Sequence, residues 1–165
     1  MSKTMEDLQE AFAGESQANR RYLAFAKKAD EEGYHQVARL FRAAAHAETV
    51  HALSHLRALG AVNETAANLQ AAISGENYEV MSMYPGFMED AQNENDAKAL
   101  KSFRHAFEVE KVHEALYRGA AANLGQEAED FAYYVCPVCG YTEARNAPER
   151  CPVCGMPGSK FEKID

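Results

Sequence analysis

The sequence has no long apolar run. No stretch approaches the roughly 18 consecutive apolar residues of a membrane-spanning helix, and the first residues, Met1 to Asp7, lack the apolar region of a secretory signal. Proline is also scarce, with 5 in 165 residues, whereas 47% of the residues are hydrophobic and 25% are charged. This composition is typical of a folded globular protein. We therefore expect a cytoplasmic protein with no membrane partner.

Positive charge is in short supply. Lysine and arginine number 17 against 25 aspartates and glutamates, which gives a formal net charge of −8. A negative protein repels phosphate backbones and anionic membrane surfaces, so nucleic acid is not an expected partner. Several of these acidic residues are candidate metal ligands, and a bound cation would neutralise part of the charge.

Cysteine is absent from the first 135 residues. All four cysteines then occur in two Cys-Pro-Val-Cys-Gly motifs, Cys136 with Cys139 and Cys151 with Cys154, separated by 11 residues. In a reducing compartment such pairs favour metal binding over disulfides. The spacing predicts a tetrahedral site with four thiolate ligands, and the motif alone fits structural zinc as well as iron.

The pattern of the chain changes near residue 126. From residue 4 to about 124, apolar residues recur at intervals of three and four, which indicates helices. Aromatic, β-branched, cysteine, proline and glycine residues dominate the remainder, which predicts short strands around the cysteine pairs. We expect two domains, 1–126 and 127–165, and the second is too small to fold without a metal or a partner.

Four helical segments are predicted in the first domain. The first begins at Thr4, with Asp7 in a capping-box-like position, and ends at Gly33. The others cover about 35–60, the stretch after residue 65, and the stretch from residue 95 to about 125. Because proline removes a hydrogen bond from a helix interior, we expect a kink in the third segment near Tyr84 and Pro85. Four helices of similar length predict an all-α four-helix bundle.

The two halves of this helical region repeat one pattern. In each, a lone glutamate precedes a Glu-x-x-His motif, by 33 residues in the first half and by 34 in the second. Residues three apart lie on one helix face, so both side chains of the motif can reach one site. A di-iron carboxylate site in a bundle uses one glutamate from each of two helices and Glu-x-x-His from each of the others. The residues that fill these places are Glu15, Glu48, His51, Glu76, Glu110 and His113.

A surface salt bridge is the simpler interpretation of any one Glu-x-x-His pair. A third copy, Glu32-x-x-His35, contains Gly33 at a predicted helix end and is rejected. Matched elements in both halves favour a metal site, and we expect its ligands to be buried, on the same stripes as apolar residues such as Phe41. Oxygen-rich ligands favour iron or manganese over zinc, and a mixed-metal site stays open.

Glu79, one helical turn after Glu76, is a seventh potential ligand. Glu76-x-x-Glu79 followed by Tyr84-Pro85 resembles the third-helix signature of the rubrerythrins, and the resemblance covers almost the whole chain, from a ferritin-like bundle of up-down helix pairs to a β-rich rubredoxin-like tail. In that family the residues matching Glu79 and His51 exchange as ligands of one iron when the redox state changes.

Two tyrosines also resemble family residues. Tyr22 and Tyr84 correspond to tyrosines that hydrogen-bond the site carboxylates in rubrerythrins, although both fit equally well as ordinary core aromatics.

The resemblance implies a peroxide reductase that serves in oxidative stress defence. Hydrogen peroxide would be reduced to water at two iron ions in the bundle, which the single iron at the four cysteines would then re-reduce. The external donor would be a rubredoxin or an NAD(P)H-dependent reductase, and subunits would pair head to tail in a homodimer or a larger oligomer. Two alternatives are a ferritin-like iron oxidase or storage protein, and a helical interaction protein stapled by zinc at the cysteines.

Overall fold

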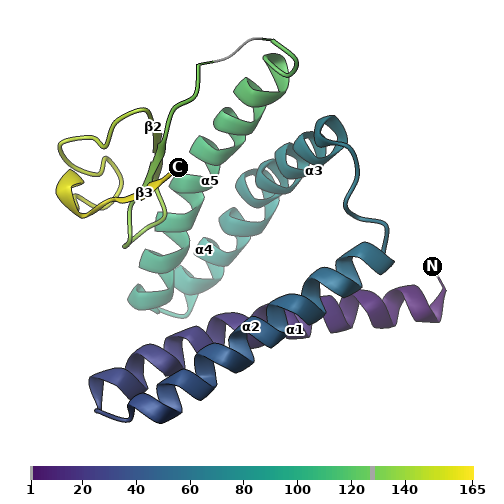
Figure 1. Ribbon diagram of the computed structural model, residues 1–165. Coiled ribbons are helices and arrows are strands. Elements are labelled where there is room, and N and C mark those ends of the chain that lie inside the picture. The colour runs from purple at the N-terminus through teal and green to yellow at the C-terminus, as the bar shows by residue number, and fades with distance from the viewer. Residues whose placement is uncertain (1, 127–128) are drawn as a thin grey trace. The chain divides into compact units, whose positions relative to one another are not determined.

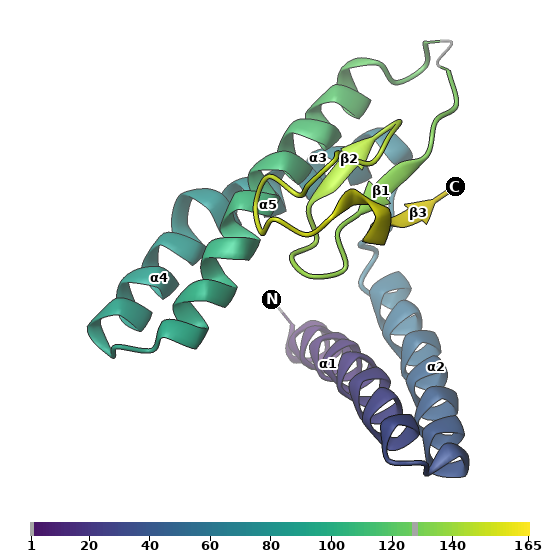
Figure 2. The same ribbon diagram turned by 90° about the vertical axis from the view of Figure 1, so that its left-hand side faces the viewer.

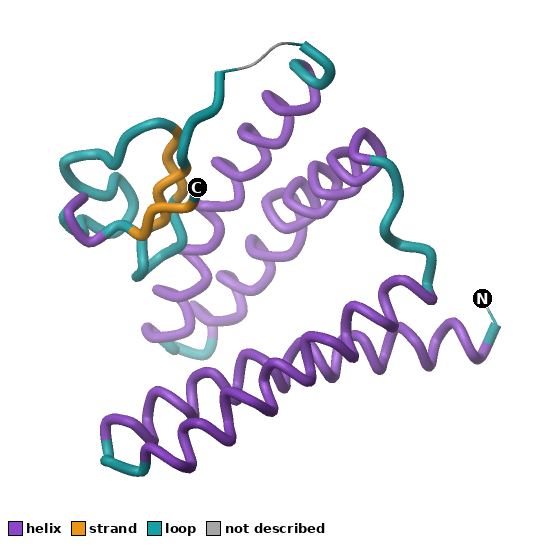
Figure 3. The backbone as a smooth tube through the Cα atoms, in the orientation of Figure 1, coloured by secondary structure: helices purple, strands orange, loops and turns teal. Residues whose placement is uncertain are grey.

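The computed structural model describes residues 2–126 and 129–165. Helices form the chain up to residue 122, and the strands follow near the C-terminus (Figures 1 and 3). The chain divides into two compact units, Met1–Asn63 and Glu64–Asp165. None of the helices in the described residues has the length and apolarity that a membrane crossing requires.

The first unit is a hairpin of two long helices, α1 (Lys3–Glu31) and α2 (His35–Ala58). Gly33 makes the turn between them in the left-handed region, with φ of 83°, where a residue without a Cβ is least strained. The two helices pack through small side chains, and the buried residues are Ala26, Ala29, Ala38, Ala45 and Ala52. Such a contact brings the helix backbones close together.

The predicted start of the first helix at Thr4 is wrong. Ser2 has an extended backbone, and its hydroxyl accepts a hydrogen bond from the amide of Met5 at 3.3 Å, so the helix begins at Lys3. Asp7 contributes an ion pair with Lys3 instead of the expected capping box. Serine at the position before a helix satisfies an amide that has no partner inside the helix, which explains the earlier start.

The second unit contains the remaining helices. Helix α3 (Thr65–Tyr78) passes through a π-helical turn, η1 (Glu79–Met83), into α4 (Tyr84–Asn93), and α5 (Ala97–Ala122) packs against all three. The predicted kink at Tyr84 and Pro85 is therefore placed slightly too late. The irregular turn lies before the proline, which occupies the first turn of α4, where its missing amide hydrogen costs little.

A small antiparallel sheet completes the second unit. Its strands are β1 (Tyr133–Val135), β2 (Thr142–Ala144) and β3 (Glu162–Ile164), in the order β2-β1-β3, and a short 3-10 turn, η2 (Gly158–Lys160), precedes β3. Val135 pairs with Thr142. The predicted short strands around the cysteine pairs are thus present. The predicted domain boundary, between 126 and 127, borders residues 127–128, which lie outside the described residues.

Candidate metal centres

The four cysteines converge as the sequence predicts. The Sγ atoms of Cys136 and Cys154 lie 3.5 Å apart, those of Cys139 and Cys151 lie 3.4 Å apart, and all four lie within 4.8 Å of one another. A metal with bonds to sulfur of about 2.3 Å would have tetrahedral sulfur-to-sulfur edges of about 3.8 Å. The donor set therefore fits a tetrathiolate metal site, and none of the cysteines is in a disulfide.

Two matching backbone turns hold these thiols. The amide of Gly140 donates to the carbonyl of Cys136, and the amide of Gly155 donates to that of Cys151. Both glycines have positive φ, 83° and 78°, so each knuckle needs a residue without a Cβ at this position. Burial raises the pKa of the Cys139 thiol, and a bound cation would offset that by stabilising the thiolate.

The first carboxylate cluster lies in the helical hairpin. Glu15 comes from α1, and Glu48 and His51 lie one turn apart on α2. His51 Nδ1 is 3.0 Å from a Glu48 oxygen and 3.9 Å from a Glu15 oxygen. One ligand atom from each residue lies within 4.8 Å of the others, so these three could share one ion.

The second cluster repeats this geometry in the other unit. Glu76 comes from α3, and Glu110 and His113 lie one turn apart on α5, with His113 Nδ1 2.7 Å from a Glu110 oxygen. Burial, and then the nearby negative charge of Glu110, raise the pKa of Glu76 to about 7. The hydrogen bond to Glu110 raises the pKa of His113. Crowded carboxylates of this kind are the chemistry that a cation stabilises, so the cluster fits a metal.

Glu79 lies close enough to the second cluster to be influenced by the charges of Glu110 and His113. Burial and the charge of Glu110 raise its pKa, while His113 opposes the shift. Tyr84 is close enough that burial, followed by the charge of Glu79, raises the pKa of its phenol. Glu79 is nevertheless not one of the three residues whose ligand atoms already converge. It is an additional carboxylate that can approach the cluster.

The π-helical turn explains the extra residue of the second half. From Glu15 to Tyr22 is 7 positions, and from Glu76 to Tyr84 is 8. The remaining intervals match, since Tyr22 to Phe41 and Tyr84 to Phe103 are both 19. A π turn accommodates one more residue than an α turn, and the amide of Tyr84 accordingly donates to the carbonyl of Glu79, five residues back. The mismatch between 33 and 34 was thus a sequence signal for this turn.

Each half carries a matching aromatic cluster. Tyr22 and Tyr84 each lie near a phenylalanine three residues later and a second phenylalanine on the partner helix, with ring centroids 6.2 to 6.4 Å from the tyrosine. The phenylalanines are Phe25 and Phe41 in one half, and Phe87 and Phe103 in the other. The packing agrees with the core-aromatic interpretation, and hydrogen bonding of either tyrosine to a site carboxylate stays a prediction.

Within each unit taken by itself the candidate ligands are partly exposed, and their burial in an assembled bundle stays a prediction. The side chain of His51 is 55% exposed and that of Glu15 is 31% exposed, and no polar or charged residue among the described ones is fully buried. Convergence of ligand atoms, rather than burial, supports the metal assignment.

Glu32 and His35 do not form a site of the same kind. Glu32 follows the end of α1, whereas His35 begins α2, so the two do not share a helix face. His35 Nδ1 instead contacts Asp30 at 3.1 Å. The rejection of this third copy agrees with the structure.

The four-cysteine module contacts the second cluster within the same chain. Strand β2 lies against α5 (Figure 2), and His113 Nε2 is 3.0 Å from the Thr142 hydroxyl. That hydroxyl donates to the carbonyl of Gly140 at 3.0 Å. Thr142 could not be predicted from the sequence, because no spacing rule relates two residues 29 positions apart in different modules.

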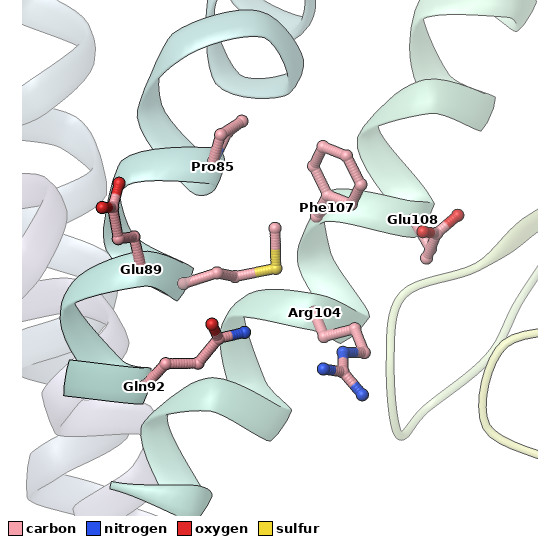
Figure 4. A pocket seen from close by; sticks show the side chains of 7 residues that line it. Pro85, Glu89, Gln92, Arg104, Phe107 and Glu108 are labelled. Carbon is pink, nitrogen blue, oxygen red and sulfur yellow. The ribbon is translucent and has the colours of Figure 1, made fainter. Parts of the chain in front are cut away.

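A surface groove between α4 and α5 is separate from these clusters. Its volume is about 390 Å³, and Pro85, Glu89, Arg104 and Phe107 are among the side chains around it (Figure 4). No predicted metal ligand lines the groove. The candidate sites are therefore defined by converging ligand atoms and not by this hollow.

Comparison with known proteins supports the metal assignment. A family model described as rubrerythrin matches residues 6–121, and one described as the rubredoxin-like domain of rubrerythrin matches residues 134–162. The chain is 35% identical to rubrerythrin-2 of Clostridium acetobutylicum, over 96% of this chain and 95% of that protein. It is 39% identical to nigerythrin of Nitratidesulfovibrio vulgaris, over 98% and 86% of the two chains.

A solved structure is also similar. Fully reduced, all-ferrous nigerythrin matches with a TM-score of 0.61 and 34% identity, covering 99% of this chain and 88% of that one. The expected combination of a ferritin-like helical region with a small rubredoxin-like domain is thereby confirmed, as are the Glu/His clusters and the four cysteines as candidate iron sites.

Proposed function

This chain belongs to the rubrerythrin family, and from that premise we propose that it is an oxidoreductase that reduces hydrogen peroxide to water. The observation that carries the proposal is the repeated Glu, Glu, His cluster together with a tetrathiolate site in one chain. The first domain, 1–126, would hold the reacting metal pair, and the second, 127–165, would supply electrons one at a time.

A complete di-iron site requires the two clusters to come together. Each unit leaves large apolar side chains exposed on its helices, which are a basis for pairing. Examples are Phe25, Leu40 and Leu53 in the first unit, and Tyr78, Met81 and Phe87 in the second. We propose that one helical hairpin of each kind pairs into a four-helix bundle, within one chain or between two copies in a head-to-tail dimer.

The residues of the site have distinct roles in this proposal. Iron bound at the two clusters would supply the two electrons that peroxide reduction requires. Glu79 and His51 would exchange as ligands of one iron. Glu79 lies outside the group of Glu76, Glu110 and His113, and the His51 ring is half exposed, so both side chains have room to move. Tyr84, whose phenol pKa is raised by burial and then by the charge of Glu79, would donate a hydrogen bond to a site carboxylate, and Tyr22 would do so in the other half.

The proposed reaction consumes two electrons and two protons for each peroxide and yields two water molecules. The electrons would enter from a rubredoxin or an NAD(P)H-dependent reductase through the four-cysteine site. Metal analysis tests the assignment first, since we expect three irons per chain with the visible colour of a ferric thiolate. Zinc alone at the cysteines and nothing at the clusters would instead support a helical interaction protein.

The substrate is tested by mixing the reduced protein with peroxide or with oxygen. We expect peroxide to oxidise the reduced iron much faster than oxygen does. The reverse order, together with assembly into a large shell and accumulation of iron, would support a ferritin-like oxidase or storage protein. Slow reaction with both oxidants would contradict either function.

A further inference from the structure

We infer that Thr142 is a positioning residue, which fixes the ring of His113 from the four-cysteine module and completes an electron route inside one chain. The route runs from Cys139 through the adjacent Gly140 and the Thr142 hydroxyl to His113. The inference rests on the proposed function in that His113 is taken as a metal ligand. It goes further by giving Thr142 a role, by fixing the direction of its hydrogen bonds, and by placing the entry of electrons at His113.

The direction of the hydrogen bonds follows from counting hydrogens. A hydroxyl has one hydrogen, and the carbonyl of Gly140 can only accept, so the Thr142 hydroxyl donates to Gly140. Its oxygen then accepts the hydrogen of His113 Nε2, 3.0 Å away. The proton of the imidazole is thereby placed on Nε2, and the lone pair of Nδ1 is left for a metal on the side of Glu110.

The surrounding contacts hold this arrangement in place. Thr142 begins β2 and pairs with Val135 of β1, next to Cys136. A Cβ placed on Gly140 would lie 3.8 Å from the Val109 side chain of α5, so the cysteine knuckle is in ordinary contact with the helix that carries His113. The bond from Thr142 thus joins two rigid elements, and a threonine hydroxyl attached to a paired strand has little freedom to move away.

The two histidines of the repeat differ at this point. The side chain of His113 is 28% exposed and has a partner at each ring nitrogen, whereas that of His51 is 55% exposed and contacts only carboxylates among the described residues. A fixed imidazole suits electron entry, and a less restrained one suits ligand exchange. The different surroundings of the two histidines therefore assign electron entry to the half with His113 and ligand exchange to the half with His51.

Electron transfer by this route balances simply. With iron bound at the cysteines and at the clusters, one electron would pass from the ferrous tetrathiolate, which would become ferric, to one ferric ion of the cluster pair. The external donor would then reduce the tetrathiolate again, and a second passage would reduce the other ferric ion. Two passages supply the two electrons that one peroxide consumes.

The hydrogen bond can be tested without turnover in the full chain loaded with zinc, a diamagnetic probe. Nitrogen-15 NMR should show His113 as the Nε2-H tautomer with a slowly exchanging ring hydrogen. Thr142→Val keeps the branched shape but removes the hydroxyl, and should accelerate this exchange by about tenfold or more, from a typical hydrogen-bond contribution. Thr142→Ser should restore protection, and His51 should be unaffected by either change.

Electron transfer is measured in the iron-loaded chain after one pulse of peroxide. Thr142→Val should slow re-reduction of the oxidised site by about ten- to a hundredfold, the usual effect of losing a partner of a ligating histidine. Thr142→Ser should stay near the parent rate, and oxidation by the pulse should be unchanged. An unaltered His113 exchange rate, or equal re-reduction rates in the parent and Thr142→Val chains, would overturn the inference.

The outcomes separate this inference from the proposed function. If His113 nitrogen shifts do not respond to zinc although Thr142→Val alters the ring hydrogen, the ligand assignment fails and the hydrogen bond stands. If zinc shifts His113 and Thr142→Val changes nothing, the metal site stands and the positioning role fails.

Discussion

Single residues distinguish this site from a generic pair of Glu, Glu, His clusters. Glu79 brings a carboxylate next to three ligands that already converge, and burial, followed by the charge of Glu79, raises the pKa of the Tyr84 phenol. Four of the ligands could be predicted because residues three apart on a helix share a face, and Glu15 and Glu76 could be predicted from the matching intervals of the two halves. Thr142 could not be predicted, because its contact with His113 depends on how a strand packs on a helix.

Replacement of Glu79 tests its role directly. Glu79→Ala leaves the converged trio of Glu76, Glu110 and His113 in place, so we expect iron content to change little. Peroxide turnover should fall by about ten- to a hundredfold, because the exchangeable carboxylate is lost. The measurements are iron per chain and the steady rate with peroxide. Glu89→Ala, an exposed glutamate on α4, is the matched control and should alter neither.

At the scale of elements, the π-helical turn η1 determines where Glu79 lies. The sequence signal of this turn is the one-residue difference between the repeats, whereas Pro85 alone predicts an irregularity slightly too late in the chain. A proline rule identifies a disturbed helix but cannot say which hydrogen bonds rearrange, and here those of the preceding turn do. The start of α1 is a similar case, since the sequence analysis predicted Thr4 and the structure has Ser2 as the cap.

Deleting Ser82 should convert the π turn into an ordinary α turn. The deletion would give the second half the seven-residue interval that separates Glu15 from Tyr22, so Glu76 and Tyr84 should keep their relation, whereas Glu79 would lose the widened turn that begins at its own position. We expect helix content by circular dichroism to persist while peroxide turnover is lost. Ser82→Ala keeps the length and should retain activity. Full activity after the deletion would show that the π turn is dispensable.

Asp30, next to the turn between α1 and α2, should make the stability of the fold depend on pH. Hydrogen bonds from His35, and then from Arg42, lower the pKa of Asp30 below its ordinary 3.8. A carboxylate with a lowered native pKa stabilises the fold above its unfolded pKa, and the contribution disappears as pH falls through the native value. Asp30→Asn should therefore lower the melting temperature at neutral pH.

The same comparison in acid checks the sign. The difference in melting temperature between Asp30→Asn and the parent should shrink toward zero well below pH 3.8. Glu31→Gln, an exposed neighbour at the end of α1, should cause no comparable loss at neutral pH. A difference that persists unchanged in acid would mean that the charge of Asp30 contributes nothing.

At the scale of the whole molecule, the sequence pattern correctly predicted a helical region followed by a small four-cysteine module, and the need of that module for a metal stays a prediction. Apolar residues at intervals of three and four, and cysteines in pairs, are local patterns. They can be recognised in the sequence without knowing how the elements pack against one another. Burial of the ligands stays a prediction, because it depends on which helix faces meet when a four-helix bundle forms.

The division of labour between the two domains gives the last prediction. In the full chain, Cys139→Ser with Cys154→Ser removes two of the four thiolates, so the tail should lose its iron while the Glu/His clusters keep their ligands. One pulse of peroxide should still oxidise the reduced clusters at the parent rate, because that step needs no electron from the tail. Continuous turnover with a reductase should collapse, and truncation before Tyr134 should do the same. Turnover that continues unchanged in these variants would mean that the four-cysteine module is structural, and electrons would then have to enter the clusters directly.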